Sequence, residues 1–406
     1  MRILATQETD WLARNPIVHH RLLEWLSTHG ADVTVIDYDI DWAKRAGSVV
    51  EPRREIKGVH KYFADSRVVV VRPAMLRWRP LARLSWLLGN VRELRRLFRR
   101  EPPDVLVGYG ISNALLTMIV ARLAGRRFVY HVMDALHTHA DGAIARGVAR
   151  WIERVTMRLA DRVVVVSQGL RDYALGMGAR RERTVVIPIG VTLVGPEADR
   201  GARARDALGL AEGDVALIFV GWQYAFSGLR ELVADFARRG AECPWLRLLV
   251  VGTGDLDGEL REMRARAGLE RQVLMTGQLP ASEVGALVEG ADIGLLPARR
   301  NETMEHLVPT KVVEYMERGK AVMATRLRGL EAEFPALPGM LYIDRPEAII
   351  DRVCALDIAG DPAAIRRVAR TLGETCRAAI RARPDWDAVT REFAELLRSE
   401  AALARR

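Results

Sequence analysis

The sequence has little of what would build a disulfide framework, a zinc site or a membrane span. Only three cysteines occur among its 406 residues, Cys243, Cys354 and Cys376, and they form no CxxC pair. Their odd number and wide spacing argue against a disulfide scaffold and a zinc site. No apolar run approaches the length of a membrane-spanning helix. The first residues enter a strand-like run without a signal-peptide layout. We therefore expect a folded protein of the reducing cytoplasm that carries no metal.

Acidic residues are nearly absent from one segment. The net charge of the chain is +9, and the stretch between Arg72 and Arg100 holds nine arginines and a single acid, Glu93. Apolar residues such as Trp78 and Trp86 are interleaved with them. A basic helix with an apolar face suits an anionic membrane surface, which would place the protein at the inner face of a membrane. The alternative is a packed helix with a solvated arginine face. Nucleic acid is disfavoured, because no zinc-finger spacing or RNP-like strand occurs.

Short β-branched runs alternate with helical patterns through both halves of the chain. Continuous runs, such as the four valines at 163–166, indicate strands buried on both faces, hence parallel strands covered by helices. The pattern lapses between Gly190 and Asp214, which marks a linker. We therefore predict an α/β protein with two doubly wound, Rossmann-like domains facing a cleft. Their ranges are 1–195 and 196–384, with a final helix over 385–406 that packs toward the first domain.

A helix start after Pro309 and Thr310 carries one lysine and one glutamate. The free N–H groups and positive dipole end of a helix N-terminus suit phosphate, and Lys311 adds a charge for the same group. Glu314, one turn on, can accept two hydroxyl hydrogen bonds of the kind a ribose offers. The arrangement indicates a sugar-nucleotide site. The alternative is an ordinary helix with a solvated lysine and glutamate.

Three glycine-containing turns follow predicted strands of the second half. The turn at Gly252 and Gly254 lacks the third glycine of a dinucleotide fingerprint, so NAD is disfavoured. The other two turns would place a diphosphate and a flat base, and their residues are Gly221, Gln223 and Ser227 in the first and Gly277, Gln278 and Leu279 in the second. The aromatic residues of the first turn could form either a cleft wall or a lid on the core.

Histidines and an aspartate cluster at the end of a strand in the first half. His131, Asp134 and His137 lie in a spacing that is not typical of a metal site, and contacts with acceptor hydroxyls are the more plausible role. Some of these side chains are expected to cap the following helix instead. The run Asp37-x-Asp39-x-Asp41 resembles a metal-binding acidic stretch, but a solvated loop is the preferred interpretation.

Taken in their order along the chain, the motifs resemble those of the retaining GT-B glycosyltransferases of family 4, the glycosyl transferases group 1. The segment 163–167 with the junction 186–191 is similar to the family's strand-Ser and "PNGV" elements, although Ile189 replaces the usual Asn and Thr192 the usual Asp. The glycine turns, the run 291–297 and the helix with Glu314 follow in family order. The family's donor-sugar Glu would stand eight residues before Glu314, where this chain has His306, with Glu305 adjacent.

The resemblance implies roles for individual residues. The first domain would bind the acceptor, with Asn15 and His137 bordering it, and the second would bind a UDP- or GDP-sugar. His131, Asp134, Glu305 and His306 would lie near the reacting sugar. Lys311 would supply charge that the family usually places in the turn after Gly221. The resemblance implies no cofactor and no divalent metal, since lysine and helix dipoles would stabilise the leaving diphosphate.

These observations predict an enzyme that transfers a hexose from a nucleotide-diphosphate sugar to a hydroxyl acceptor on a glycan or a lipid. One alternative is a GT-B-fold sugar-nucleotide epimerase or hydrolase, which would turn over the sugar nucleotide without an acceptor. Another is a non-catalytic, membrane-associated sugar-binding protein.

Overall fold

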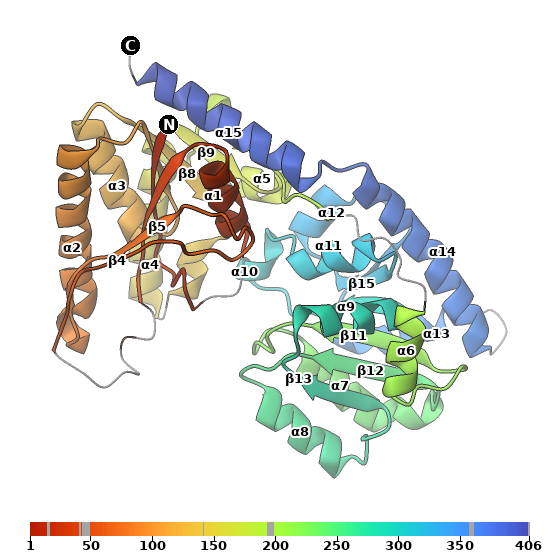
Figure 1. The fold of residues 1–406 in the computed structure, drawn as a ribbon. Helices are drawn as coiled ribbons and strands as arrows, with labels where there is room; N and C mark the ends of the chain where they lie inside the picture. The colour runs from red at the N-terminus through yellow and green to blue at the C-terminus, as the bar shows by residue number, and fades with distance from the viewer. Residues whose placement is uncertain are drawn as a thin grey trace. The chain divides into compact units, whose positions relative to one another are not determined.

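The computed structural model describes residues 1–13, 17–39, 42, 49–140, 142–192, 199–356 and 361–404. The chain forms two compact units, one made of Met1–Ile189 with Trp386–Arg406 and the other of Gly190–Asp385 (Figure 1). The first boundary therefore falls a few residues before the one that the sequence suggests. The final helix belongs to the first unit.

The first unit is built on an eight-stranded sheet with the order β10-β9-β8-β7-β1-β2-β5-β4. Neighbouring strands are parallel except for β4, which runs antiparallel to β5. Most of these strands were predictable because their valines and isoleucines are buried on both faces. The strands of this unit are β1 Arg2–Thr6, β2 Asp32–Ile36, β3 Val50–Glu51, β4 Arg54–Ile56, β5 Val69–Arg72, β6 Met75–Leu76, β7 Val105–Gly108, β8 Arg127–Val132, β9 Arg162–Val165 and β10 Thr184–Val186.

Helices cover this sheet. Helix α2 packs beside α3, α3 beside α4, and α15 packs against α1 and β8. The buried Glu400 of α15 accepts hydrogen bonds from Arg127 Nε and Arg162 Nε, each at 2.8 Å, which fixes the final helix to two strand starts. The helices are α1 Val18–Thr28, α2 Arg79–Arg100, α3 Ser112–Leu123, η2 Leu136–His139, α4 Ala143–Leu159, α5 Gln168–Gly176, η3 Arg181–Arg183 and α15 Trp386–Leu403.

The second unit has a six-stranded, wholly parallel sheet with the order β13-β12-β11-β14-β15-β16. Its strands are β11 Val215–Val220, β12 Leu246–Val251, β13 Val273–Gly277, β14 Ile293–Leu296, β15 Ala321–Thr325 and β16 Met340–Ile343. Its helices are α6 Arg200–Ala207, α7 Leu229–Arg239, η4 Gly240–Glu242, α8 Asp257–Arg266, α9 Ala281–Gly290, α10 Glu302–Glu305, α11 Thr310–Glu317, α12 Arg328–Glu333, η5 Pro346–Ala348, α13 Ile349–Cys354 and α14 Pro362–Arg381.

Part of the expected linker is a packed helix. Helix α6 lies against α9, and its Gly201 approaches the Glu289 carbonyl so closely that a Cβ there would come within 2.8 Å of the oxygen. Arg205 is buried and pairs with Asp292 at 3.2 Å. The polar composition that suggested a linker therefore belongs to a helix whose arginine is satisfied by an ion pair.

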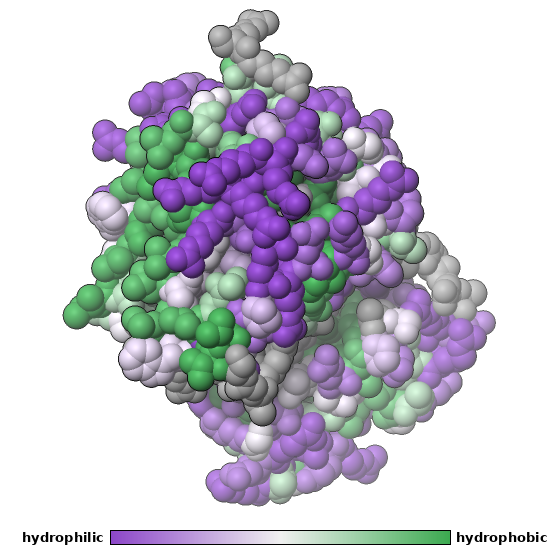
Figure 2. All heavy atoms as spheres, turned by 60° about the vertical axis from the view of Figure 1, so that its left-hand side comes forward, coloured by the Kyte–Doolittle hydropathy of each residue, from purple (hydrophilic) through white to green (hydrophobic). Residues whose placement is uncertain are grey.

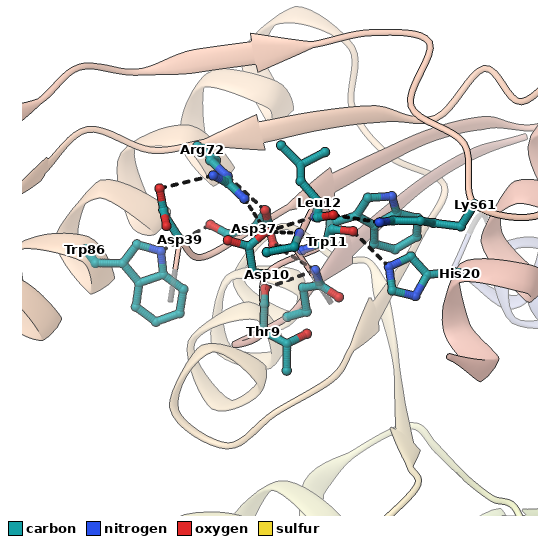
Figure 3. A network of polar contacts seen from close by, with 12 residues as sticks. Thr9, Asp10, Trp11, Leu12, His20, Asp37, Asp39, Lys61, Arg72 and Trp86 are labelled. Atoms are coloured by element: carbon teal, nitrogen blue, oxygen red, sulfur yellow. Dashed lines mark hydrogen bonds and ion pairs between the residues drawn. The ribbon is translucent and has the colours of Figure 1, made fainter. Parts of the chain in front are cut away.

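The acidic run after β2 is buried, which corrects the expectation of a solvated loop. Asp37 and Asp39 surround the guanidinium of Arg72, at 3.0 and 3.2 Å, and Asp10 completes the group (Figure 3). Asp41 lies outside the described residues. Arg72 is also removed from the basic surface proposed for the segment 72–100, because its side chain is only 8% exposed.

This buried network holds the loop that follows β1. Asp37 Oδ1 accepts hydrogen bonds from Gln7 Nε2 and the Trp11 amide, at 2.8 and 2.9 Å. Asp10 Oδ1 accepts from the amides of Leu12 and Ala13. Burial raises the pKa of Asp37 to about 6 although Arg72 opposes the shift. Three carboxylates around one arginine thus fix the loop at the carboxyl end of the first strand.

Candidate functional site

Three glycine turns, at Gly221, Gly252 and Gly277, lie side by side at one edge of the sheet in the second unit, which we call the glycine edge. They follow β11, β12 and β13, whose carboxyl ends meet there because the strands are parallel and adjacent. The amide of Gly221 donates to Val251 O at 2.9 Å, and the amide of Gly252 donates to Gly277 O at 2.8 Å. All three glycines have positive φ, at 124°, 121° and 72° along the chain. A side chain would strain each turn.

The first two turns approach each other too closely for any side chain between them. A Cβ on Gly252 would lie 2.3 Å from Gly221 O, and one on Gly254 would lie 2.3 Å from the Gln223 amide. Gln223 is fully buried and donates from Nε2 to Gly252 O at 3.1 Å. Its Oε1 is buried and has no hydrogen-bond partner among the described residues. An unused acceptor therefore remains beside the glycines.

Exposed aromatic side chains flank this edge, so they do not form a lid on the core; the cleft wall stays a prediction. Trp222 and Tyr224 are 49% and 46% exposed. Tyr224 stacks on Phe226 with the ring centroids 4.9 Å apart. Ser227, in contrast, is buried at the start of α7, where its Oγ lies 3.5 Å from the Leu229 amide. The turn therefore exposes Trp222 and Tyr224 to solvent and buries Ser227.

Helix α11 brings Lys311 over the first glycine turn. The helix is tied to β11 by the hydroxyl of Tyr315, which accepts from the Val220 amide at 2.8 Å. Lys311 Nζ lies 4.0 Å from the centre of the Phe219 ring, and a Cβ on Gly221 would be 3.0 Å from Nζ. Among the residues that the structure describes, Nζ has no ion pair or hydrogen bond. The ammonium is therefore held close to the glycine backbone and is available to an anion.

The environment of this lysine lowers its proton affinity. Burial reduces the pKa of Lys311 to about 8, and Glu314 partly opposes the shift. Glu314 itself is exposed, one turn along the helix, and Pro309 and Thr310 precede the lysine at the helix start. In the third turn Gln278 is exposed and Leu279 is half-buried. The three glycine turns and the start of α11 are thus brought together at one edge of the sheet.

This lowered pKa leads to a prediction about pH. Affinity for a diphosphate-containing ligand is expected to fall as the pH rises above about 8, because the neutral amine loses its attraction for phosphate. Titration calorimetry between pH 7 and 10 measures this, with roughly tenfold loss for each pH unit as the limiting slope. Lys311→Arg serves as the control, since arginine stays charged over the range. A parent profile as flat as that of the arginine variant would contradict the assignment.

Glu305 and His306 lie on and just after the short helix α10. Glu305 Oε1 accepts from Arg300 Nε at 2.8 Å, and its Oε2 accepts from the Arg328 amide at 3.3 Å. Burial favours a raised pKa for Glu305, but these donors outweigh it and the pKa is lowered. The carboxylate is therefore ionised and already engaged. His306 is half-buried at the C-terminal end of the helix.

In the first unit, His131 lies near the end of β8 and is buried. Its Nδ1 is 3.2 Å from the hydroxyl of Tyr109, while Nε2 has no partner among the described residues. Burial lowers the pKa of His131 to about 3, so the ring is neutral. Asp134 is more accessible and pairs with His139 Nε2 at 2.8 Å.

The structure places His137 inside the first unit. Its ring is fully buried, with Nδ1 2.8 Å from Glu153 Oε2 and 3.1 Å from the hydroxyl of Tyr173. These contacts make it part of a buried polar group, and its predicted contact with an acceptor stays a prediction. Asn15, the other residue predicted to contact an acceptor, lies outside the described residues.

The first unit holds buried polar groups that the sequence did not single out, and one of them, His19, packs against the same tyrosine as His131. Both ring nitrogens of His19 are buried without a partner among the described residues, and so is Thr9 Oγ1. His19 stacks 4.9 Å from His20 and lies 4.7 Å from Tyr109. Burial, reinforced by the neighbouring histidines, lowers its pKa well below 6.5. The two adjacent histidines at 19 and 20 are visible in the sequence. Only the structure shows that the ring nitrogens of His19 have no partner among the described residues.

Within the described residues, no group of three or more His, Cys, Asp or Glu side chains could hold a metal ion. None of the described helices is both long and apolar enough to cross a membrane.

The two units and the glycine edge define the class of the protein as a GT-B-type α/β fold. The Anabaena protein HepE in complex with UDP superimposes with a TM-score of 0.73 at 17% identity, over 98% of this chain and all of that one. Sucrose-phosphate synthase from Thermosynechococcus elongatus gives 0.72 at 20% identity, over 99% of this chain and all of that one. WaaG, a glycosyltransferase involved in lipopolysaccharide biosynthesis, gives 0.65 at 13%, over 98% and 99%. At these identities the likeness shows the fold alone.

Comparison of sequences identifies the family. The Glycosyl transferase 4-like domain matches residues 17–190, and the domain called Glycosyl transferases group 1 matches residues 214–357. Together the matches take in most of both units, so the chain belongs to the group 1 glycosyltransferases, as its motifs predicted.

Curated relatives carry transferase names. The chain is 28% identical over 269 residues to 2-deoxystreptamine glucosyltransferase of Streptomyces kanamyceticus, covering 61% of this chain and 65% of that protein. It is 28% identical over 210 residues to a GDP-mannose-dependent phosphatidylinositol monomannoside mannosyltransferase of Mycolicibacterium smegmatis, covering 50% and 53%. The matches therefore span less than two thirds of the length of these relatives.

Proposed function

We propose that the protein is a retaining glycosyltransferase that moves a hexose from a nucleotide-diphosphate sugar to a hydroxyl acceptor. The observation that carries the proposal is the ammonium of Lys311 held without a partner over the glycine turn at Gly221. A half-buried cation beside glycine backbone is suited to a diphosphate, which needs charge and close approach. Family membership supports the same activity.

The diphosphate, ribose and base of the donor would each contact different residues of the glycine edge. Lys311 and the start of α11 bind the diphosphate, and the exposed Glu314 accepts hydrogen bonds from ribose hydroxyls. The turn at Gly277 and Gln278 lies beside the base, and the unused Gln223 Oε1 accepts from a hydroxyl group. HepE is named in complexes with UDP and UDP-glucose, and the mycobacterial relative is named GDP-mannose-dependent. A UDP- or GDP-sugar is the donor that we propose.

The acceptor would meet the buried polar groups of the first unit. His131 Nε2, His19 and Thr9 Oγ1 are unpartnered hydrogen-bonding atoms, and Asp134 lies on the loop after β8. Hydroxyl-rich molecules satisfy such atoms, since each hydroxyl both donates and accepts. The relatives are named for 2-deoxystreptamine and for phosphatidylinositol monomannoside. We propose a glycan or lipid-linked acceptor.

Charge and position, more than a protein base, would provide the rate enhancement. As the glycosidic bond to the leaving diphosphate breaks, the ammonium of Lys311 and the α11 dipole stabilise the negative charge that develops. A phosphate oxygen of the leaving group takes the acceptor proton while the acceptor oxygen bonds the anomeric carbon on the same face. Glu305 and His306 would lie near the sugar, with Glu305 held in place by Arg300.

Product analysis tests this function. The protein is incubated with UDP- and GDP-hexoses and a panel of glycan and lipid-linked acceptors, and the product linkage is read by NMR. Transfer with retained anomeric configuration is the expected result. Turnover that proceeds equally well without any acceptor would instead establish an epimerase or hydrolase. Tight donor binding without turnover on any acceptor would indicate a binding protein.

A chelator experiment separates lysine-based from metal-based stabilisation of the leaving group. Turnover is expected to be unchanged by EDTA, because Lys311 supplies the charge that a divalent ion would otherwise provide. The measurement compares initial rates before and after chelation. Loss of activity that is restored by adding Mg²⁺ or Mn²⁺ would refute metal independence.

A further inference from the structure

Every exposed charged side chain described on three adjacent helices of the first unit is an arginine. Helices α2, α3 and α4 contain seven, one and four arginines respectively, and no lysine. Their only acids are Glu93 and Glu153, and both are buried. Glu93 is paired with Arg53, and Glu153 contacts His137 inside the unit. The outward side of these helices therefore carries a large excess of positive charge, although Arg83 is paired with Glu8 at 2.6 Å.

The same helices expose large apolar side chains, which are costly in water. Leu123 of α3 and Ile144 of α4 are 84% and 86% exposed. Figure 2, in which the α2 side of Figure 1 comes forward, shows apolar side chains gathered beside a hydrophilic band. Because α2 packs beside α3 and α3 beside α4, the exposed apolar residues belong to one continuous layer of helices. They are Trp78, Leu81, Leu84, Leu88, Ile119, Leu123, Ile144, Val148 and Trp151.

The two kinds of side chain are ordered along α2. Positions 81, 84, 88, 92, 95 and 99 recur at three- and four-residue spacing and share one face of the helix. The first three are exposed leucines, and the last three are the exposed arginines Arg92, Arg95 and Arg99. No described residue forms an ion pair with these three arginines. Helix α4 has a similar apolar row at Ile144, Val148 and Trp151.

We propose that this face of α2, α3 and α4 docks on an anionic lipid bilayer. A bilayer surface offers negative headgroups for the arginines and an apolar interior for the leucines, and tryptophan favours the boundary between them. Nucleic acid would match the charge but not the exposed leucines. A second copy of the same face would be repelled by its own arginines. The face extends beyond the segment 72–100, since α3 and α4 supply half of its apolar side chains.

Vesicle co-sedimentation tests the docking face without relying on catalysis. The intact protein is expected to bind vesicles of phosphatidylcholine with phosphatidylglycerol, but not vesicles of phosphatidylcholine alone. Replacing Arg92, Arg95 and Arg99 together by glutamine should weaken binding about 100-fold, at roughly fivefold for each charge. Replacing Leu84, Leu88 and Trp151 by serine should weaken it roughly tenfold or more.

A matched variant controls for total charge. Arg266, Arg271 and Arg352 are exposed arginines of the second unit, and replacing all three by glutamine removes the same charge from elsewhere. This variant should bind vesicles as the parent does, and circular dichroism should show all variants folded. Equal binding by the two arginine variants, or equal partitioning onto neutral vesicles, would overturn the proposal. Tighter binding to an RNA oligonucleotide than to the vesicles, at the same salt concentration, would also overturn it.

Discussion

Replacing Arg72 by alanine is expected to destabilise the protein by about 3–5 kcal/mol, because it leaves three buried carboxylates without their cation. Asp10 and Asp37 are fully buried and Asp39 nearly so, and Arg72 contacts all three (Figure 3). For a unit of this size the loss corresponds to a fall in melting temperature of about 6–20 °C. Thermal unfolding followed by circular dichroism measures it.

The pH dependence of this loss identifies its cause. Burial already raises the pKa of Asp37 to about 6 with Arg72 present, so removing the arginine raises it further. A carboxyl with a raised pKa in the folded state favours folding at low pH and loses that contribution as the pH rises. The destabilisation should therefore be smaller at pH 4.5 than at pH 7.5. Arg266→Ala, at an exposed ion pair, should cost at most about 1 kcal/mol. An Arg72→Ala variant as stable as this control would show that the network contributes little.

Lys311→Ala and Glu314→Ala should each weaken nucleotide-sugar binding by about 1.5–3 kcal/mol, which is roughly a 10- to 150-fold rise in Kd. The lysine loses a charge-assisted contact with the diphosphate, and the glutamate loses hydrogen bonds with the ribose. Glu314 is exposed, so its replacement should leave stability unchanged. Titration calorimetry with the best donor measures both.

Glu270 and Arg271 provide a matched control for this pair. Both are exposed, carry the same two charges, and precede β13, at the edge of the sheet away from the glycine turns. Glu270→Ala and Arg271→Ala should bind the donor with the parent's affinity. If Lys311→Ala and Glu314→Ala behave like these controls, the donor site lies elsewhere.

The fold was largely readable from the sequence because its central strands are continuous apolar runs. Valines 163–165 are buried, and so are β11 and β12 except for the half-buried Val220 and Arg247. Continuous apolar runs of this kind indicate strands covered on both faces. The short strands β3, β4 and β6 were not predicted, because two or three residues are too few to show an alternating apolar pattern. Helix α6 was not predicted, because the sequence does not distinguish its buried Arg205 from a solvated linker residue. Only the fold shows that Asp292 lies beside it.

The arrangement of the glycine turns was more predictable than the contacts in the first unit. Glycines after strands and a lysine at a helix start leave a local signal, and the structure brings Gly221, Gly252 and Lys311 together. Their role in donor binding stays a prediction. The contact of His137 with the buried Glu153 could not be predicted, because a histidine that contacts a buried glutamate has the same sequence signature as one that binds a ligand. Asp37 and Asp39 were misread for the same reason, since Arg72 lies 33 residues or more away in sequence.

Calorimetric binding of a panel of UDP-, GDP- and ADP-sugars to the intact protein, compared with Lys311→Ala, tests the central claim most directly. We expect that at least one sugar nucleotide binds the parent, that the free nucleoside diphosphate competes with it, and that Lys311→Ala binds it roughly 10-fold or more weakly. Failure of every sugar nucleotide to bind, or equal affinity for the parent and Lys311→Ala, would contradict the proposed donor site.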